Sequence, residues 1–184
     1  MNKFKAIIKV ACNFIRIVIL RIIYGSKINV ALIQMFSITT SINVEKGSLN
    51  IGEKVTTYPY VHLSAAEEGI LDIGRRTFFN RHCTVVARKY IHIGEKCLFG
   101  PNVCIYDHDH RFDSKIIYSD EYVTGKIVIG DRCWIGANVI ILRGTELGDD
   151  CIVGSGTILK GHYPSGTMIK SDANITVSSI KEMG

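Results

Sequence analysis

The chain has 184 residues, of which 47% are apolar and 21% are charged, and its formal net charge is +5. This length fits one domain with a sizeable core, and the apolar content excludes disorder over most of the chain. The charged fraction is ordinary and the body of the chain has no tract rich in lysine and arginine, so the composition does not indicate a nucleic-acid-binding protein.

The first predicted element is a basic amphipathic helix over residues 1–27. Apolar residues recur there at i, i+3 and i+4 spacing: Phe4, Ile7, Ile8, Ala11, Phe14, Ile15, Val18, Ile19 and Ile22. A polar stripe of Lys5, Lys9, Asn13 and Arg16 lies opposite. Basic residues interrupt the apolar run, which argues against a signal peptide or a transmembrane helix. Two roles stay open: residues 1–24 lie on an anionic membrane surface, or the helix caps the open end of a repeat domain.

Residues 28–184 are predicted to form that repeat domain. From residue 129 the sequence divides into hexads that open with large aliphatic residues: Ile129, Ile135, Ile141, Leu147, Val153 and Leu159. The same frame occurs upstream, with openers at Ile51, Ile73, Ile93, Phe99 and Ile105. An apolar period of six is typical of an all-β solenoid of short parallel strands, a β-helix. Three hexads, roughly eighteen residues, would close one triangular coil with the aliphatic residues inside.

Four of the six cysteines occupy the fifth position of a hexad: Cys83, Cys97, Cys133 and Cys151. This position takes small or β-branched residues, so the cysteines are predicted to be buried core residues without disulfides or nucleophilic roles. A reducing, cytoplasmic compartment follows from that prediction.

The regular pattern breaks at residues 105–113, which read IYDHDHRFD. Position five of this hexad is Asp109, and a lone carboxylate inside a coil would be costly. The frame resumes at Ile129, so residues of about 107–126 are predicted to leave the coil as an extruded loop, and such loops often carry function. A metal site on His108 and His110 and a plain surface patch both stay open as alternatives to a catalytic role.

The segments FGPNVCIYDHDH and VIGDRCWIGANVIILRGTELGDDCIVGSGTIL resemble those of the hexapeptide-repeat acyltransferases. The resemblance covers roughly residues 47–165. It implies a left-handed parallel β-helix, assembly as a homotrimer, and transfer of an acyl group from acyl-coenzyme A. Within that superfamily the segments most resemble sugar O-acetyltransferases of the maltose, galactoside and nodulation type, and relatives that acetylate capsule or lipopolysaccharide sugars.

The resemblance also implies site residues. It gives His110 as the general base, a role that suits a neutral imidazole, and Asn80 as a contact of the acceptor hydroxyl. Glu121 or Asp113 on the loop is expected to hold the His110 tautomer, and His108 and Asp107 are expected beside the acceptor. The expected contacts of coenzyme A lie on small residues and their neighbours: Trp134, Gly136, Ala137, Ser155, Gly156 and Lys160. No metal is expected.

The sequence therefore predicts an acetyl-CoA-dependent O-acetyltransferase that modifies a hydroxyl of a saccharide or lipid-linked glycan in capsule, lipopolysaccharide or exopolysaccharide biosynthesis. Its predicted location is the cytoplasm, with peripheral contact at the inner face of the plasma membrane. An N-acyltransferase acting on an amino-sugar nucleotide and a non-catalytic hexapeptide-repeat scaffold are the alternatives.

Overall fold

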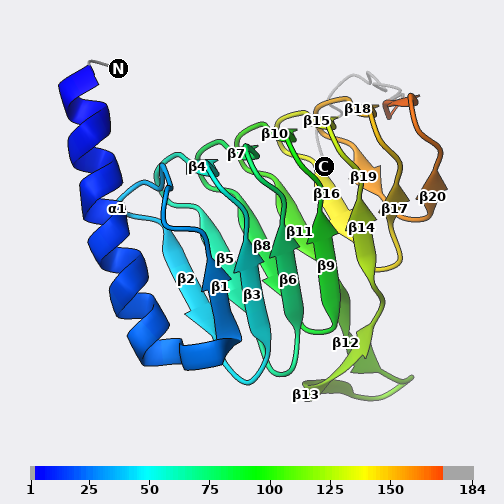
Figure 1. The fold of residues 1–184 in the computed structure, drawn as a ribbon. Coiled ribbons are helices and arrows are strands. Elements are labelled where there is room, and N and C mark those ends of the chain that lie inside the picture. Colours follow the sequence, from blue (N-terminus) through cyan, green and yellow to red (C-terminus); the bar gives the residue numbers. More distant parts are fainter. Residues whose placement is uncertain (1–2, 172–184) are drawn as a thin grey trace, which may run out of the picture.

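The computed structural model describes residues 3–171, with side chains from residue 7 onward. The chain winds into a three-sided stack of coils, with helix α1 (Lys3–Tyr24) across the end at which the first coil begins (Figure 1). A short 3-10 turn, η1 (Gly25–Lys27), leads from the helix into the first strand. Each coil contributes one short strand to each of three parallel sheets.

The first sheet contains β1 (Ile28–Val30), β3 (Ser48–Ile51), β6 (Ile70–Ile73), β9 (Tyr90–Ile93), β14 (Ile127–Ile129), β17 (Glu146–Leu147) and β20 (His162–Tyr163). The second sheet contains β4 (Thr56–Thr57), β7 (Phe78–Phe79), β10 (Leu98–Phe99), β15 (Trp134–Ile135), β18 (Ile152–Val153) and β21 (Met168–Ile169). The third sheet contains β2 (Ser41–Val44), β5 (His62–Ala65), β8 (Thr84–Ala87), β11 (Cys104–Tyr106), β16 (Ile140–Leu142) and β19 (Ile158–Leu159). These parallel sheets confirm the predicted β-helix.

The pairing of strands in neighbouring coils shows which coils have the predicted length of eighteen residues. Ile129 pairs with Leu147, eighteen residues further on, as predicted. Leu49 pairs with Leu71, twenty-two residues on, so the early coils are longer than three hexads. The extra residues lie at the corner that joins the third sheet to the first, for example residues 66–69 between β5 and β6.

The core is the column of hexad openers inside the coils. Ile93, Ile105, Ile129, Ile135 and Ile141 are completely buried. The four cysteines at position five are also buried, and all six cysteines of the chain are free thiols. The predicted burial of the hexad openers and of the position-five cysteines is confirmed. Each coil stacks on the next at the strand spacing of about 4.8 Å, so one aliphatic layer packs directly on another.

Asn13 and Arg16 of the polar stripe of α1 face the solenoid, and this shows one role of the helix. The backbone carbonyls at the edge of the first coil have no preceding coil to bond. Asn13 donates to the Phe36 carbonyl at 3.0 Å, Arg21 donates to the Val30 carbonyl at 2.7 Å, and Arg16 donates to the carbonyls of Ser37 and Thr40. The helix therefore caps the open end by satisfying these acceptors. Of the two roles left open, the capping role is confirmed, because Asn13 and Arg16 direct their donors at the first coil.

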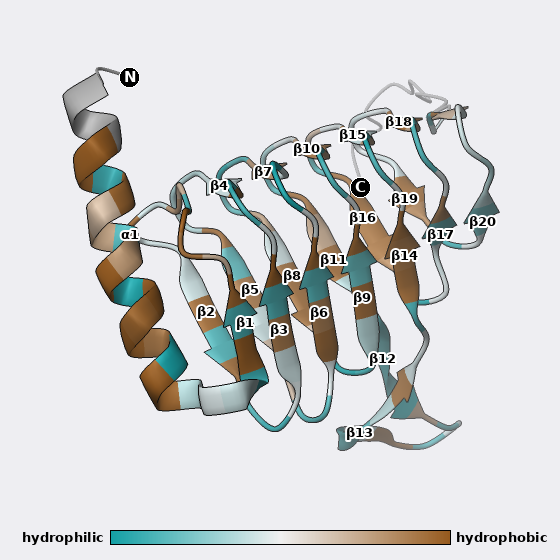
Figure 2. Cartoon of the chain, in the orientation of Figure 1, coloured by the Kyte–Doolittle hydropathy of each residue, from teal (hydrophilic) through white to brown (hydrophobic). Residues whose placement is uncertain are grey.

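The opposite side of α1 is apolar and exposed. Figure 2 shows long hydrophobic stretches on a helix that lies outside the coils. The exposed residues of this outer face are Ile7, Ile8, Phe14, Ile15, Val18, Ile19, Ile22 and Ile23. Among the helices that the structure describes, none is long and apolar enough to cross a bilayer.

The predicted loop is an antiparallel hairpin of β12 (His108–Phe112) and β13 (Ile117–Thr124), which projects from the stack (Figure 1). The hairpin lies within the predicted loop of about 107–126. Asp107, directly before the hairpin, turns inward, and its side chain is completely buried. Asp109 lies on the hairpin, where it pairs with Arg143 at 2.5 Å and ties the hairpin to the next coil.

Candidate active site

The hairpin grows from the corner between the third and first sheets, and Asp107 anchors its base. Its Oδ1 accepts the backbone N–H of Arg88 at 2.9 Å, and its Oδ2 accepts those of Lys89 and Tyr90, both at 2.8 Å. Burial alone would raise the pKa of this carboxyl, but hydrogen bonds from His108 and the three backbone N–H groups outweigh it, and the pKa is lowered. Asp107 was expected beside the acceptor, but its side chain is completely buried and both of its oxygens are hydrogen-bonded to neighbouring residues.

His110 stands on β12 with its ring exposed. Its Nδ1 lies 3.3 Å from the carbonyl oxygen of Tyr118 on β13. A carbonyl oxygen only accepts, so Nδ1 carries the proton and donates, which leaves a lone pair on Nε2. The ring of Tyr122 packs against the imidazole with the centroids 4.7 Å apart. The hairpin thus holds His110 with its Nε2 lone pair free of protein hydrogen bonds in the described structure.

His108 has a different environment. Its Nδ1 donates to Asp107 Oδ1 at 3.1 Å, and only 13% of its side chain is exposed. The rings of Tyr106 and Tyr122 meet it edge-on at 5.8 and 5.5 Å. His108 is packed between two tyrosines at the foot of the hairpin. It is therefore a structural residue and less accessible to an acceptor than His110.

Two acidic residues were expected to support His110, and neither contacts it. Glu121 forms an ion pair with Arg111 at 2.6 Å. Asp113 caps the turn of the hairpin through the backbone N–H groups of Lys115 and Ile116, and it accepts the Tyr118 hydroxyl at 2.8 Å. The carbonyl of Tyr118 takes the expected role. No side-chain pattern could reveal it, because the acceptor is a backbone atom across a hairpin.

Tyr122 is a further residue that the sequence did not indicate, and its partner is Arg88. The Arg88 guanidinium lies over the Tyr122 ring, 3.6 Å from its centroid, and also pairs with Glu67. Tyr122 is therefore held between a cation and the His110 ring. This contact fixes the hairpin against the previous coil.

The small residues predicted for coenzyme A lie at another corner, the one that joins the second sheet to the third. Asn80, Gly136 and Ala137, and Ser155 and Gly156 follow the second-sheet strands β7, β15 and β18. Ala137 donates its backbone N–H to Ser155 Oγ at 3.1 Å. Stacking requires glycine at position 136, since an added Cβ would lie 2.6 Å from the Ser155 nitrogen. Gly156 turns the chain with φ of +74°.

The other two residues predicted to contact coenzyme A, Trp134 and Lys160, lie at different corners. Trp134 lies on β15 with its side chain outward and is 56% exposed, next to the small-residue corner. Lys160 follows β19, so it lies at the hairpin's corner. The third sheet, with strands of two to four residues, separates the two corners by roughly 10 Å. One chain therefore does not bring His110 together with Asn80 or Ala137.

The outer surfaces of the three sheets differ in polarity. The first sheet presents a ladder of mostly polar residues in register, from Asn50 through Asp72 and His92 to Glu146. The second and third sheets expose apolar side chains toward their C-terminal ends: Leu98, Trp134, Ile140, Ile158 and Met168. These apolar residues flank the small-residue corner, so two faces of the prism are suited to a protein neighbour.

In residues 3–171, no three side chains of histidine, cysteine, aspartate or glutamate are grouped so that they could hold a metal ion. Within the hairpin, the Nδ1 atoms of His108 and His110 are both engaged by protein oxygens.

Residues 126–160 match the family model described as the hexapeptide repeat of succinyl-transferase. The chain is 30% identical over 132 residues to the "Putative lipopolysaccharide biosynthesis O-acetyl transferase WbbJ" of Escherichia coli, an alignment that covers 67% of each protein. It is 30% identical over 114 residues to the galactoside O-acetyltransferase of Escherichia coli, covering 62% of this chain and 55% of that protein.

The solved structure of a maltose O-acetyltransferase from Clostridium difficile 630 superposes with a TM-score of 0.51 and 26% identity, covering 80% of this chain and 72% of that one. The fold is therefore the left-handed parallel β-helix of hexapeptide-repeat proteins. The chain spans about half to two thirds of the length of the two Escherichia coli relatives.

Proposed function

The chain belongs to the hexapeptide-repeat acetyltransferases, and we propose that it transfers the acetyl group of acetyl-coenzyme A to a saccharide hydroxyl, with His110 as general base. The observation that carries this proposal is the contact of 3.3 Å between His110 Nδ1 and the Tyr118 carbonyl oxygen. The Tyr118 carbonyl keeps the proton on Nδ1, so Nε2 is free to accept one from an acceptor hydroxyl.

The reaction follows from these groups. His110 Nε2 removes the hydroxyl proton as the acceptor oxygen attacks the thioester carbonyl carbon, and a carbon–oxygen bond forms. Backbone N–H groups stabilise the tetrahedral oxyanion. The carbon–sulfur bond then breaks, and the imidazolium returns its proton to the leaving thiolate, so that coenzyme A departs as a thiol. No acyl-enzyme is needed, which agrees with the burial of the position-five cysteines.

We propose that the active site is composite and that the assembly is a homotrimer. The hairpin corner of one subunit would meet the small-residue corner of its neighbour, with acetyl-coenzyme A between them against Trp134, Ala137 and Ser155. Two observations support this: the corners are separated within one chain, and the sheets beside the small-residue corner are apolar outside. A closed cyclic assembly supplies the missing corner to every subunit.

We also propose peripheral contact with the inner face of the plasma membrane through the outer face of α1. Ile15 and Ile22 on this face are 61% and 78% exposed. A cyclic trimer places its three copies of α1 at one height along the axis, so their apolar faces would act together. The test is a double substitution, Ile15→Glu with Ile22→Glu, which leaves the cap intact. We expect vesicle binding to be lost while the melting temperature is kept.

The proposed activity is tested by supplying acetyl-coenzyme A with a panel of saccharides, lipid-linked glycans and amino-sugar nucleotides. We expect release of coenzyme A together with an acetyl ester on a saccharide, identified by mass spectrometry and by its lability in mild base. A base-stable amide on an amino sugar would establish N-acetylation instead. Absence of acetyl transfer to any acceptor of a glycan extract would favour the non-catalytic scaffold.

A further inference from the structure

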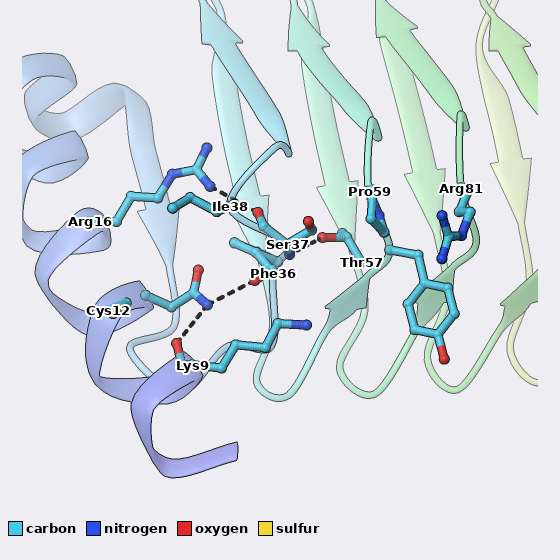
Figure 3. Close-up of a pocket in the computed structure, with 11 residues that line it drawn as sticks. Lys9, Cys12, Arg16, Phe36, Ser37, Ile38, Thr57, Pro59 and Arg81 are labelled. Carbon is cyan, nitrogen blue, oxygen red and sulfur yellow. Dashed lines mark hydrogen bonds between the residues drawn. The ribbon is translucent and has the colours of Figure 1, made fainter. Parts of the chain in front are cut away.

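A cleft of about 660 Å³ lies between α1 and the first three coils (Figure 3). One wall is the flank of α1, with Lys9, Cys12, Asn13 and Arg16. The facing wall comes from successive coils at one corner: Phe36, Ser37, Ile38, Thr57, Tyr58, Pro59 and Arg81. None of the residues proposed for acetyl transfer lines this cleft, so it is a separate site.

The cleft is cationic and has no acidic residue in its lining. Lys9, Arg16 and Arg81 form no ion pair within the described part of the chain. Burial lowers the pKa of Lys9 and of Arg16, because both cations are partly removed from water. A ligand with negative charge would compensate them, and ammonium and guanidinium groups are the usual protein partners of phosphate.

The rest of the cleft is apolar and open to the outside. The Ile38 side chain is 93% exposed and that of Tyr58 is 44% exposed, although both lie beside the three cations. In Figure 3, Lys9 and Arg16 project from α1 toward the first coil, and Arg81 stands beside Pro59. The cleft therefore offers positive charge next to apolar surface, and it adjoins the helix whose outer face is apolar.

We propose that this cleft binds the phosphate of an anionic membrane lipid, with Lys9 and Arg81 around the phosphate and the start of a hydrocarbon chain against Ile38 and Tyr58. Arg16, which donates to the Ser37 and Thr40 carbonyls, adds positive charge beside them. The cleft would give α1 a preference for anionic over neutral membranes. Arg81 follows Asn80 directly, so a saccharide linked to that phosphate would run along the corner that carries the proposed acceptor contact. The lipid site rests on the proposed membrane contact of α1, and the saccharide step also rests on the proposed acetyl transfer.

The test is binding of the full chain to vesicles of phosphatidylcholine with and without phosphatidylglycerol. The variant Lys9→Gln with Arg81→Gln removes two charges whose side chains make no hydrogen bond in the described structure. We expect its affinity for phosphatidylglycerol vesicles to fall about thirtyfold, roughly fivefold for each charge. Its affinity for neutral vesicles should stay unchanged. The control Lys96→Gln with Lys115→Gln removes two exposed charges outside the cleft. Equal losses in both variants would overturn the proposal, because they would show a general effect of charge.

Cys12 gives a local readout, since it lines the cleft and is exposed while the four position-five cysteines are buried. We expect a short-chain phosphatidylglycerol, kept below its aggregation threshold, to slow alkylation of Cys12 in the wild type and not in the double variant. Protection by inorganic phosphate at equal concentration would identify a site for soluble phosphates and would overturn the assignment to a lipid. Acetyl transfer to a soluble acceptor is measured in the same samples and should be equal in all variants, so a failure here leaves the proposed reaction untouched.

Discussion

Replacing Asp107 by asparagine tests the finding that this residue anchors the hairpin rather than binding the acceptor. The carboxylate accepts three backbone N–H groups and the His108 ring with no exposure to solvent. An amide keeps only one of the two acceptor oxygens and turns an NH2 group toward N–H donors. At least two buried donors then lose their acceptor, at about 1–3 kcal/mol each, so we expect a loss of about 2–6 kcal/mol.

The effect should depend on pH in a defined direction. The pKa of Asp107 is lowered in the folded protein, so its stabilising effect is fully present above its unfolded value of about 4. It is lost as the pH falls below that value and through the folded pKa. The difference in stability between wild type and Asp107→Asn should therefore be largest at neutral pH and shrink on acidification.

The assay is guanidinium unfolding at matched protein concentration, with Asp109→Asn as the control. Asp109 lies two residues further on, in β12, but it is half exposed and makes one ion pair, so its loss should cost less than about 1 kcal/mol. If Asp107→Asn also lost less than about 1 kcal/mol of stability and had a raised KM for the acceptor, the anchoring role of Asp107 would be refuted. The expected contact between Asp107 and the acceptor would then be supported.

Three further outcomes are expected. His110→Ala should lower kcat by about 10²–10⁴-fold without loss of the trimer, and a kcat near that of the wild type would remove the base. His108→Ala should reduce the melting temperature more than kcat, because its ring is packed between two tyrosines. Deleting residues 1–24 should destabilise the first coil, since it strips the donors from the Phe36 and Val30 carbonyls, and unchanged protease resistance of that coil would contradict the cap.

The repeat could be predicted from the sequence because each coil repeats one physical requirement. Every hexad opener must fill the interior, so residues such as Ile129 and Ile135 recur at fixed spacing, and their burial is confirmed. The longer early coils could not be predicted in the same way. Their extra residues lie at a surface corner, where no core packing imposes a period, as at residues 66–69.

The sequence predicted where the candidate site residue His110 lies, but it did not predict which groups that residue contacts. His110 lies on the hairpin as expected, but its Nδ1 partner is a backbone carbonyl rather than Glu121. Asp107 was expected beside the acceptor, and the sequence could not show that three backbone N–H groups of the preceding coil bind its carboxylate. The amphipathic pattern of α1 gave the correct helix, but it could not tell which side faces the solenoid. The polar side does, because the open coil presents carbonyls that need donors.

The composite site with His110 as base is tested most directly by complementation between two inactive variants. His110→Ala removes the base, and Ala137→Arg fills the proposed groove at the other corner. The two chains are co-expressed with different affinity tags, and trimers that contain both are isolated. Every such trimer has one junction where an intact hairpin meets an intact small-residue corner, so the account predicts about one third of wild-type kcat. Activity no higher than that of either variant alone would contradict it.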